Sequence, residues 1–132
     1  NLIIYKDELI LGKIDTNKDI FDVICLSLFN LEKVTIPSCI KKINSCAFSR
    51  CRNLRFIDIQ TNSELQSIGE DAFGFANITS IFLPSHLNQV QEDFLNIYDY
   101  LQIIEIGQNS KLNLDKIGNF NGIIMVPAKL TK

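Results

Sequence analysis

The chain has 132 residues, of which 46 % are hydrophobic, and its 13 basic and 15 acidic residues give a formal net charge of -2 at pH 7. This length and composition suit one folded domain with a sizeable core. The balanced charge argues against a nucleic-acid or membrane-surface protein, which would carry a basic patch. No apolar run approaches the roughly 18 residues of a membrane span, and no signal peptide is visible. Since the chain begins at Asn1 and ends inside an apparent repeat, we expect a piece of a longer protein.

The first segment, residues 1–30, does not follow the pattern of the rest of the chain. Residues 9–12 predict a short strand, residues 15–19 are polar and turn-like, and residues 20–29 are dense in apolar side chains.

From residue 31 onward, four stretches are copies of one another, and they begin at Leu31, Leu54, Ile78 and Leu101. The spacings are 23, 24 and 23 residues, and each copy opens with apolar-x-x-apolar-x-apolar. Such a fixed period predicts a solenoid, in which each repeat buries its apolar face against its neighbours. Residues 1–30 would then be an N-terminal capping segment, with a degenerate repeat as the alternative.

The second half of each copy repeats as well. An aromatic slot is followed three residues later by a smaller apolar residue, in the pairs Phe48 and Cys51, Phe73 and Ala76, Phe94 and Ile97. Slots filled by residues of similar size predict a stacked core. The fourth copy fits only with a two-residue insertion, and residues 124–130 resemble the start of a fifth, truncated unit.

A longer period of 47 residues lies over the first. Pro37-Ser38 recurs as Pro84-Ser85, and the run Asn-Ser-x-Leu at 62–65 recurs at 109–112. We therefore expect a short Pro-Ser turn and a longer Asn-Ser turn to alternate along the array.

Three segments, VTIPSCIKKINSCAFSRCRNL, FIDIQTNSELQSIGEDAFGFANI and SIFLPSHLNQVQEDFLNIYDYL, resemble the BspA-like leucine-rich repeats, whose units read roughly LxxIxIPxxLxxIgxxAFxxCxxL. The resemblance covers about residues 31–130. It implies an α/β repeat fold: a right-handed leucine-rich-repeat solenoid with a short parallel β-sheet on one face, of about four to five units within residues 31–132. It also implies macromolecular recognition by a cell-surface or secreted adhesion or antigen protein, with no catalysed reaction.

Side chains alternate between the two faces of a strand, so each repeat places two residues of its strand on the open face of the sheet. We predict that this face binds a protein partner, because large apolar residues with a polar rim are typical of protein interfaces. The resemblance implies that the partners are host or matrix proteins. The candidate binding residues are Phe56, Phe82, Ile103, Arg55, Asp58 and Glu105. The alternatives are that these are ordinary exposed apolar residues, or that the array packs against itself here.

The chemically reactive residues are given structural roles. Cys51 shares a slot with Ala76 and is expected in the core, whereas Cys39 and Cys46 align with charged residues and are expected at the surface, where a disulfide between them would fit a secreted protein. No zinc spacing or nucleotide-binding motif is present, so we expect neither metal nor cofactor. Asn77 begins an N-glycosylation sequon.

Other functions stay open as alternatives. One is an intracellular scaffold of the same fold, and another is a spacer for a binding region elsewhere. A third is a hydrolase that uses the paired carboxylates Glu70/Asp71 or Glu92/Asp93, although these pairs more simply suit the N-terminal end of a helical turn. Self-association through residues 123–130 is also expected, because a truncated solenoid exposes an apolar end.

Overall fold

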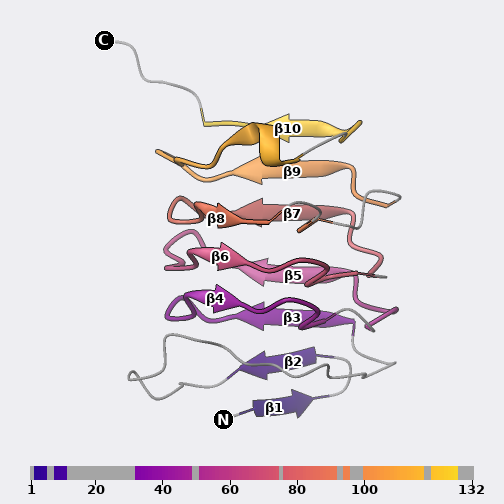
Figure 1. Ribbon diagram of the computed structural model, residues 1–132. Helices are drawn as coiled ribbons and strands as arrows, with labels where there is room; N and C mark the ends of the chain where they lie inside the picture. The colour runs from indigo at the N-terminus through magenta and orange to yellow at the C-terminus, as the bar shows by residue number, and fades with distance from the viewer. Residues whose placement is uncertain are drawn as a thin grey trace.

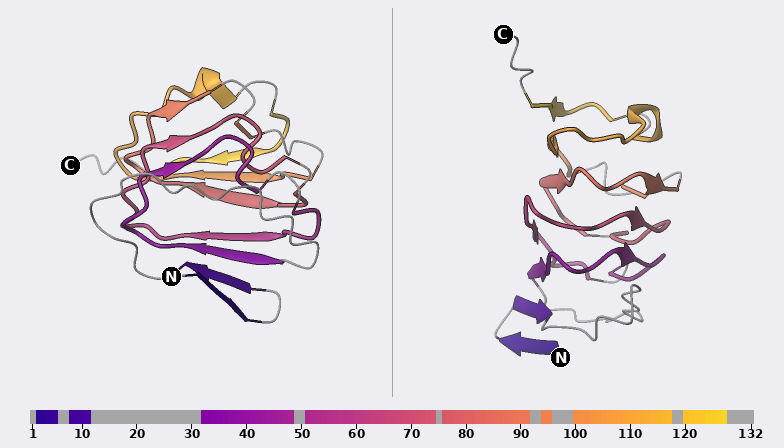
Figure 2. Two further views of the ribbon diagram at one scale, coloured as in Figure 1. Left: turned by 60° about the horizontal axis from the view of Figure 1, so that its bottom comes forward. Right: turned by 90° about the vertical axis from the view of Figure 1, so that its left-hand side faces the viewer.

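The chain forms a stack of coils in which successive repeats lie directly above one another (Figure 1). The structure is a computed structural model that describes residues 2–5, 8–11, 32–48, 51–74, 76–91, 94–95, 100–117 and 120–127. Each complete repeat contributes a longer strand to one side of the stack and a two-residue strand to the other (Figure 2). This is the stacked, parallel arrangement that the repeat period predicted.

We call the side with the longer strands the front, and it carries two sheets. One has the order β1-β2-β3-β5 and the other the order β10-β9-β7. Strands β1 and β2 pair antiparallel, and every other front pair is parallel. The strands are β1 Leu2–Tyr5, β2 Glu8–Leu11, β3 Lys33–Ile36, β5 Phe56–Ile59, β7 Ser80–Leu83, β9 Ile103–Ile106 and β10 Ile123–Met125.

The opposite side, the back, carries one narrow parallel sheet with the order β4-β6-β8. Its strands are β4 Lys42–Ile43, β6 Ser67–Ile68 and β8 Gln89–Val90. The core lies between front and back. Val34, Ile81 and Ile104 point into it from equivalent front positions and are at most 3 % exposed.

The aromatic slot forms the centre of this core. The rings of Phe48 and Phe73 stack with centroids 5.7 Å apart and planes within 2° of parallel, and both side chains are fully buried. Phe94 is also fully buried. In the slot of smaller residues, Cys51 is fully buried and Ala76 is 2 % exposed. The slots assigned from the sequence are therefore confirmed where the structure describes them, whereas Ile97 lies outside the described residues.

The turns repeat every 47 residues, as predicted. The Leu65 N–H donates to the Ser63 hydroxyl at 3.1 Å, and the Leu112 N–H donates to the Ser110 hydroxyl at 3.2 Å. The short turns match as well, since the N–H groups three residues after Pro37 and Pro84 each donate to the proline carbonyl at 3.1 Å. A backbone hydrogen bond of the same kind closes the long turns, from Ser63 to Gln60 and from Ser110 to Gly107, so the serine hydroxyl bond is what distinguishes them.

The predicted α/β class is not confirmed, because helix is almost absent from the described residues. They contain one helix, the four-residue 3₁₀ helix η1, Leu114–Ile117. The segments that lead to Phe48 and Phe73 are turns, because Cys46 and Asp71 take left-handed backbone conformations, with φ of 61° and 52°. A left-handed residue does not continue a right-handed helix. The handedness of the solenoid stays a prediction.

The front ladder is interrupted between β5 and β7, whereas the back sheet runs through the same repeats without a break. The step from β5 to β7 is the one of 24 residues, because Phe56 and Ser80 open the two strands. Near the break, Ile57 is only half-buried, although its counterparts Val34 and Ile81 are buried. The extra residue therefore coincides with a local opening of the front.

Candidate binding face

The open face consists of the outward side chains of the front strands, which form two rows across the sheet. Burial alternates along β3, β7 and β9 in step with the strand period, which places one set of side chains in the core and the other outside. The register defines the members of each row within the two front sheets, and equivalent strand positions relate the rows across the ladder break. The first row is Lys33, Phe56, Ser80, Ile103 and Ile123, and the second is Thr35, Asp58, Phe82, Glu105 and Met125.

The three predicted apolar residues all lie on this face, but they alternate between the rows. Phe56 and Ile103 belong to the first row, whereas Phe82 belongs to the second, so the three follow a zigzag across β5, β7 and β9. Phe56 projects furthest, with 59 % of its surface exposed, while Ile103 and Phe82 are half-buried. Phe82 also packs against the core cluster. That this zigzag binds a partner stays a prediction.

The predicted polar residues border the zigzag. Arg55, Asp58 and Glu105 are all exposed. The Arg55 and Phe56 N–H groups donate to the Glu32 carbonyl at 2.9 and 3.1 Å, which fixes where β5 begins. Glu105 lies directly across the strands from Phe82. An aromatic ring and a carboxylate are thereby held side by side on the open face.

The sequence analysis missed the contribution of β10 to this face. Ile123 pairs with Ile103 and Met125 with Glu105, and the two β10 side chains are 62 % and 50 % exposed. They extend both rows by one strand. The apolar run of residues 123–125 was the available signal, but the step from β9 to β10 is 20 residues rather than 23, which hid the register.

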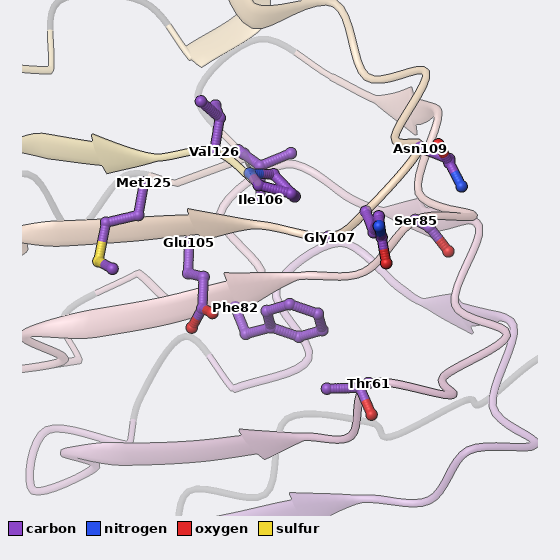
Figure 3. A pocket seen from close by; sticks show the side chains of 11 residues that line it. Thr61, Phe82, Ser85, Glu105, Ile106, Gly107, Asn109, Met125 and Val126 are labelled. Atoms are coloured by element: carbon purple, nitrogen blue, oxygen red, sulfur yellow. The ribbon is translucent and has the colours of Figure 1, made fainter. Parts of the chain in front are cut away.

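A pocket of about 450 Å³ lies in the open face near the ends of β7, β9 and β10 (Figure 3). Phe82 and Glu105 form part of its wall, and Met125 closes it from β10. Thr61, which follows β5, contributes from the other side of the ladder break. The remaining lining residues are Ser85, Ile106, Gly107, Gln108, Asn109, Val126 and Pro127.

The cysteines lie where the sequence predicted them. Cys39 and Cys46 are exposed, and Cys51 is buried. No group of three or more metal-binding side chains occurs among the residues that the structure describes. Asn77 is half-buried and its N–H donates to the Leu54 carbonyl at 2.9 Å.

The paired carboxylates do not surround the pocket. Glu70 is exposed and Asp71 is half-buried in the turn that follows β6, and neither lines the pocket. Their turn is not a helix, so the expected role at a helix start is wrong for this pair. Glu92 and Asp93 lie outside the described residues.

Comparison with known families identifies the repeat. Residues 18–121 match the BspA type leucine rich repeat region in six copies, and the chain therefore belongs to this family. Leucine-rich repeats of this kind typically serve protein recognition rather than catalysis, and the family is often associated with cell surfaces. Comparison with curated proteins and with solved structures gave no significant match. In the described part of the chain, no helix has the length and apolar character to cross a membrane.

Proposed function

We propose that this chain is the recognition domain of a cell-surface or secreted adhesion or antigen protein, and that it binds host or matrix proteins through the open face. The observation that carries the proposal is Phe56, a large aromatic side chain that is 59 % exposed on a sheet surface. A ring held in this way by a rigid strand loses little conformational freedom on binding, which makes it a suitable anchor for a protein partner.

The surrounding face supports this role. Ile103, Ile123 and Met125 add apolar area beyond the ladder break, and Asp58 and Glu105 supply charges among them. A surface with apolar centres and charged borders is typical of a protein interface. The family's frequent association with cell surfaces supports the location.

The test is binding of the purified protein to intact cells and to immobilised matrix proteins, with the variant Phe56→Asp beside it. Phe56 is exposed, so the variant should keep its fold, as circular dichroism and thermal unfolding would verify. We expect saturable binding by the parent and at least about tenfold weaker binding by the variant, as for the loss of a hot-spot aromatic.

The matched control is Leu114→Asp, which places the same charge on an exposed apolar residue of η1, away from the front sheet (Figure 2). This control should bind like the parent. Equal binding by folded Phe56→Asp would exclude the open face around β5. Absence of binding by the parent would instead favour the scaffold or spacer function.

A further inference from the structure

The pocket beside Phe82 combines apolar walls with the carboxylate of Glu105. Its carbon-rich surfaces come from Phe82, Met125, Val126 and Pro127. Among the lining residues that the structure describes, Glu105 is the only charged one, and the other polar side chains there are those of Thr61, Ser85, Gln108 and Asn109, which are neutral. A volume of about 450 Å³ is within the range of ligand-binding pockets, and it is large enough for one long side chain.

The register places the carboxylate of Glu105 between two apolar neighbours. Phe82 lies opposite it on β7 and Met125 opposite it on β10. Its neighbours along β9 on the same face are Ile103 and Gly107. None of these four residues carries a positive charge that could neutralise the carboxylate, so the negative charge is directed at whatever enters the pocket.

A second carboxylate strengthens the negative potential of this part of the face. Asp58 occupies the equivalent position on β5, across the ladder break from β7, and it is exposed. The one basic residue among the outward front positions of β3, β5, β7, β9 and β10 is Lys33, at the opposite end of the described array. Among the outward positions of these five strands, neither carboxylate therefore has a cation in its own row.

We propose that this pocket binds an arginine side chain presented by an extended segment of the partner protein. A guanidinium can donate two parallel hydrogen bonds to the Glu105 carboxylate while its plane stacks on the Phe82 ring. The aliphatic stem of the arginine would lie along Met125 and Val126, as long cationic side chains do on apolar surfaces. The amides of Gln108 and Asn109 and the hydroxyls of Thr61 and Ser85 could hydrogen-bond the peptide backbone on either side of the arginine. The inference rests on the proposed function, since it names the chemistry that the open face recognises.

The experiment titrates the ¹⁵N-labelled protein with a blocked pentapeptide that has a central arginine flanked by serines. The matched peptide contains citrulline, which keeps the shape of arginine but is neutral. We expect chemical-shift changes at the amides of Gly107, Gln108 and Asn109, and affinity for the arginine peptide about tenfold or more above that for the citrulline peptide, as for a charge-assisted pair. Higher salt should reduce this difference.

Two variants locate the effect. Glu105→Gln is isosteric and exposed, so it should fold normally and lose the preference for arginine. Glu70→Gln removes an equal charge from an exposed turn residue outside the pocket and should keep the preference. Equal affinity for the two peptides, shift changes away from the pocket, or an unaltered preference in Glu105→Gln would each overturn the inference. Chemical-shift changes at the pocket with a neutral oligosaccharide, but not with the arginine peptide, would also overturn the inference.

The outcomes separate this inference from the proposed function. Cell binding that depends on Phe56, with no response to the arginine peptide, would leave the open face as the interface and remove arginine as its ligand. An arginine-specific response that Glu105→Gln abolishes, in a protein that binds neither cells nor matrix proteins, would support the pocket and argue against an adhesive role.

Discussion

Replacement of Phe73 by leucine tests whether the stacked rings hold the repeats together. Phe73 is fully buried and its ring lies parallel to that of Phe48 at a centroid distance of 5.7 Å. Leucine keeps the site apolar but removes the ring pair, worth about 1 kcal/mol, and leaves a void that adds about 1 kcal/mol more. We therefore expect the free energy of unfolding to fall by about 2 kcal/mol.

Urea denaturation followed by circular dichroism measures this change. With a slope of about 2 kcal/mol per molar urea, the midpoint should fall by about 1 M. The matched control is Phe56→Leu, the same substitution in the same repeat at a ring that is 59 % exposed, and it should alter stability by no more than about 0.5 kcal/mol.

A double-mutant cycle with Phe48→Leu isolates the contact itself. If the two rings stabilise each other across the repeat boundary, the double variant should be more stable than the sum of the single effects predicts, by about 0.5–1.5 kcal/mol. A midpoint shift for Phe73→Leu no larger than that for Phe56→Leu would refute the assignment of the aromatic slot to the core. Additive effects would show that the rings are buried independently.

Two further substitutions probe the close approach of neighbouring repeats. Gly69→Ala would place a Cβ atom 2.3 Å from the backbone nitrogen of Ser45, so the backbone must shift, and we expect a loss of about 1–3 kcal/mol in urea denaturation; unchanged stability would contradict the packing of β6 on the β4 repeat. Ser63→Ala removes the hydroxyl that accepts the buried Leu65 N–H at 3.1 Å, and should lower the midpoint of thermal unfolding by an amount equivalent to about 1 kcal/mol, whereas Ser63→Thr, which keeps the hydroxyl, should lower it less.

The sequence was sufficient to predict the repeat architecture, because residues of similar size recur in the same order in each repeat. The positions of Phe48, Phe73 and Phe94 required three large buried residues one repeat apart, and each of them is fully buried. The Ser63 and Ser110 turns followed from the same logic, since a repeated hydroxyl two residues before a buried leucine indicates a repeated local hydrogen bond.

The features that were missed depend on backbone conformation and on loop length. The short helical turns were expected from residue type, but Cys46 and Asp71 adopt positive φ, which neither residue type requires. The ladder break coincides with one additional residue between β5 and β7. Such an insertion is visible in the sequence. Packing decides whether the strand pairing is interrupted on the front or on the back of the coil.

The alternation of the two turn types makes a pair of repeats the natural unit of this array. The Glu64 N–H donates to the Ser38 carbonyl at 2.8 Å, so the long turn sits on the short turn of the preceding repeat. Gly107 in turn approaches Ser85 so closely that an added Cβ would lie 2.8 Å from its nitrogen. An insertion or deletion of 47 residues would keep every turn against a turn of the other kind, whereas a change by one repeat would bring like turns together. Recombination within the gene should therefore be tolerated in steps of two coils, and the length of the binding face would change in the same steps.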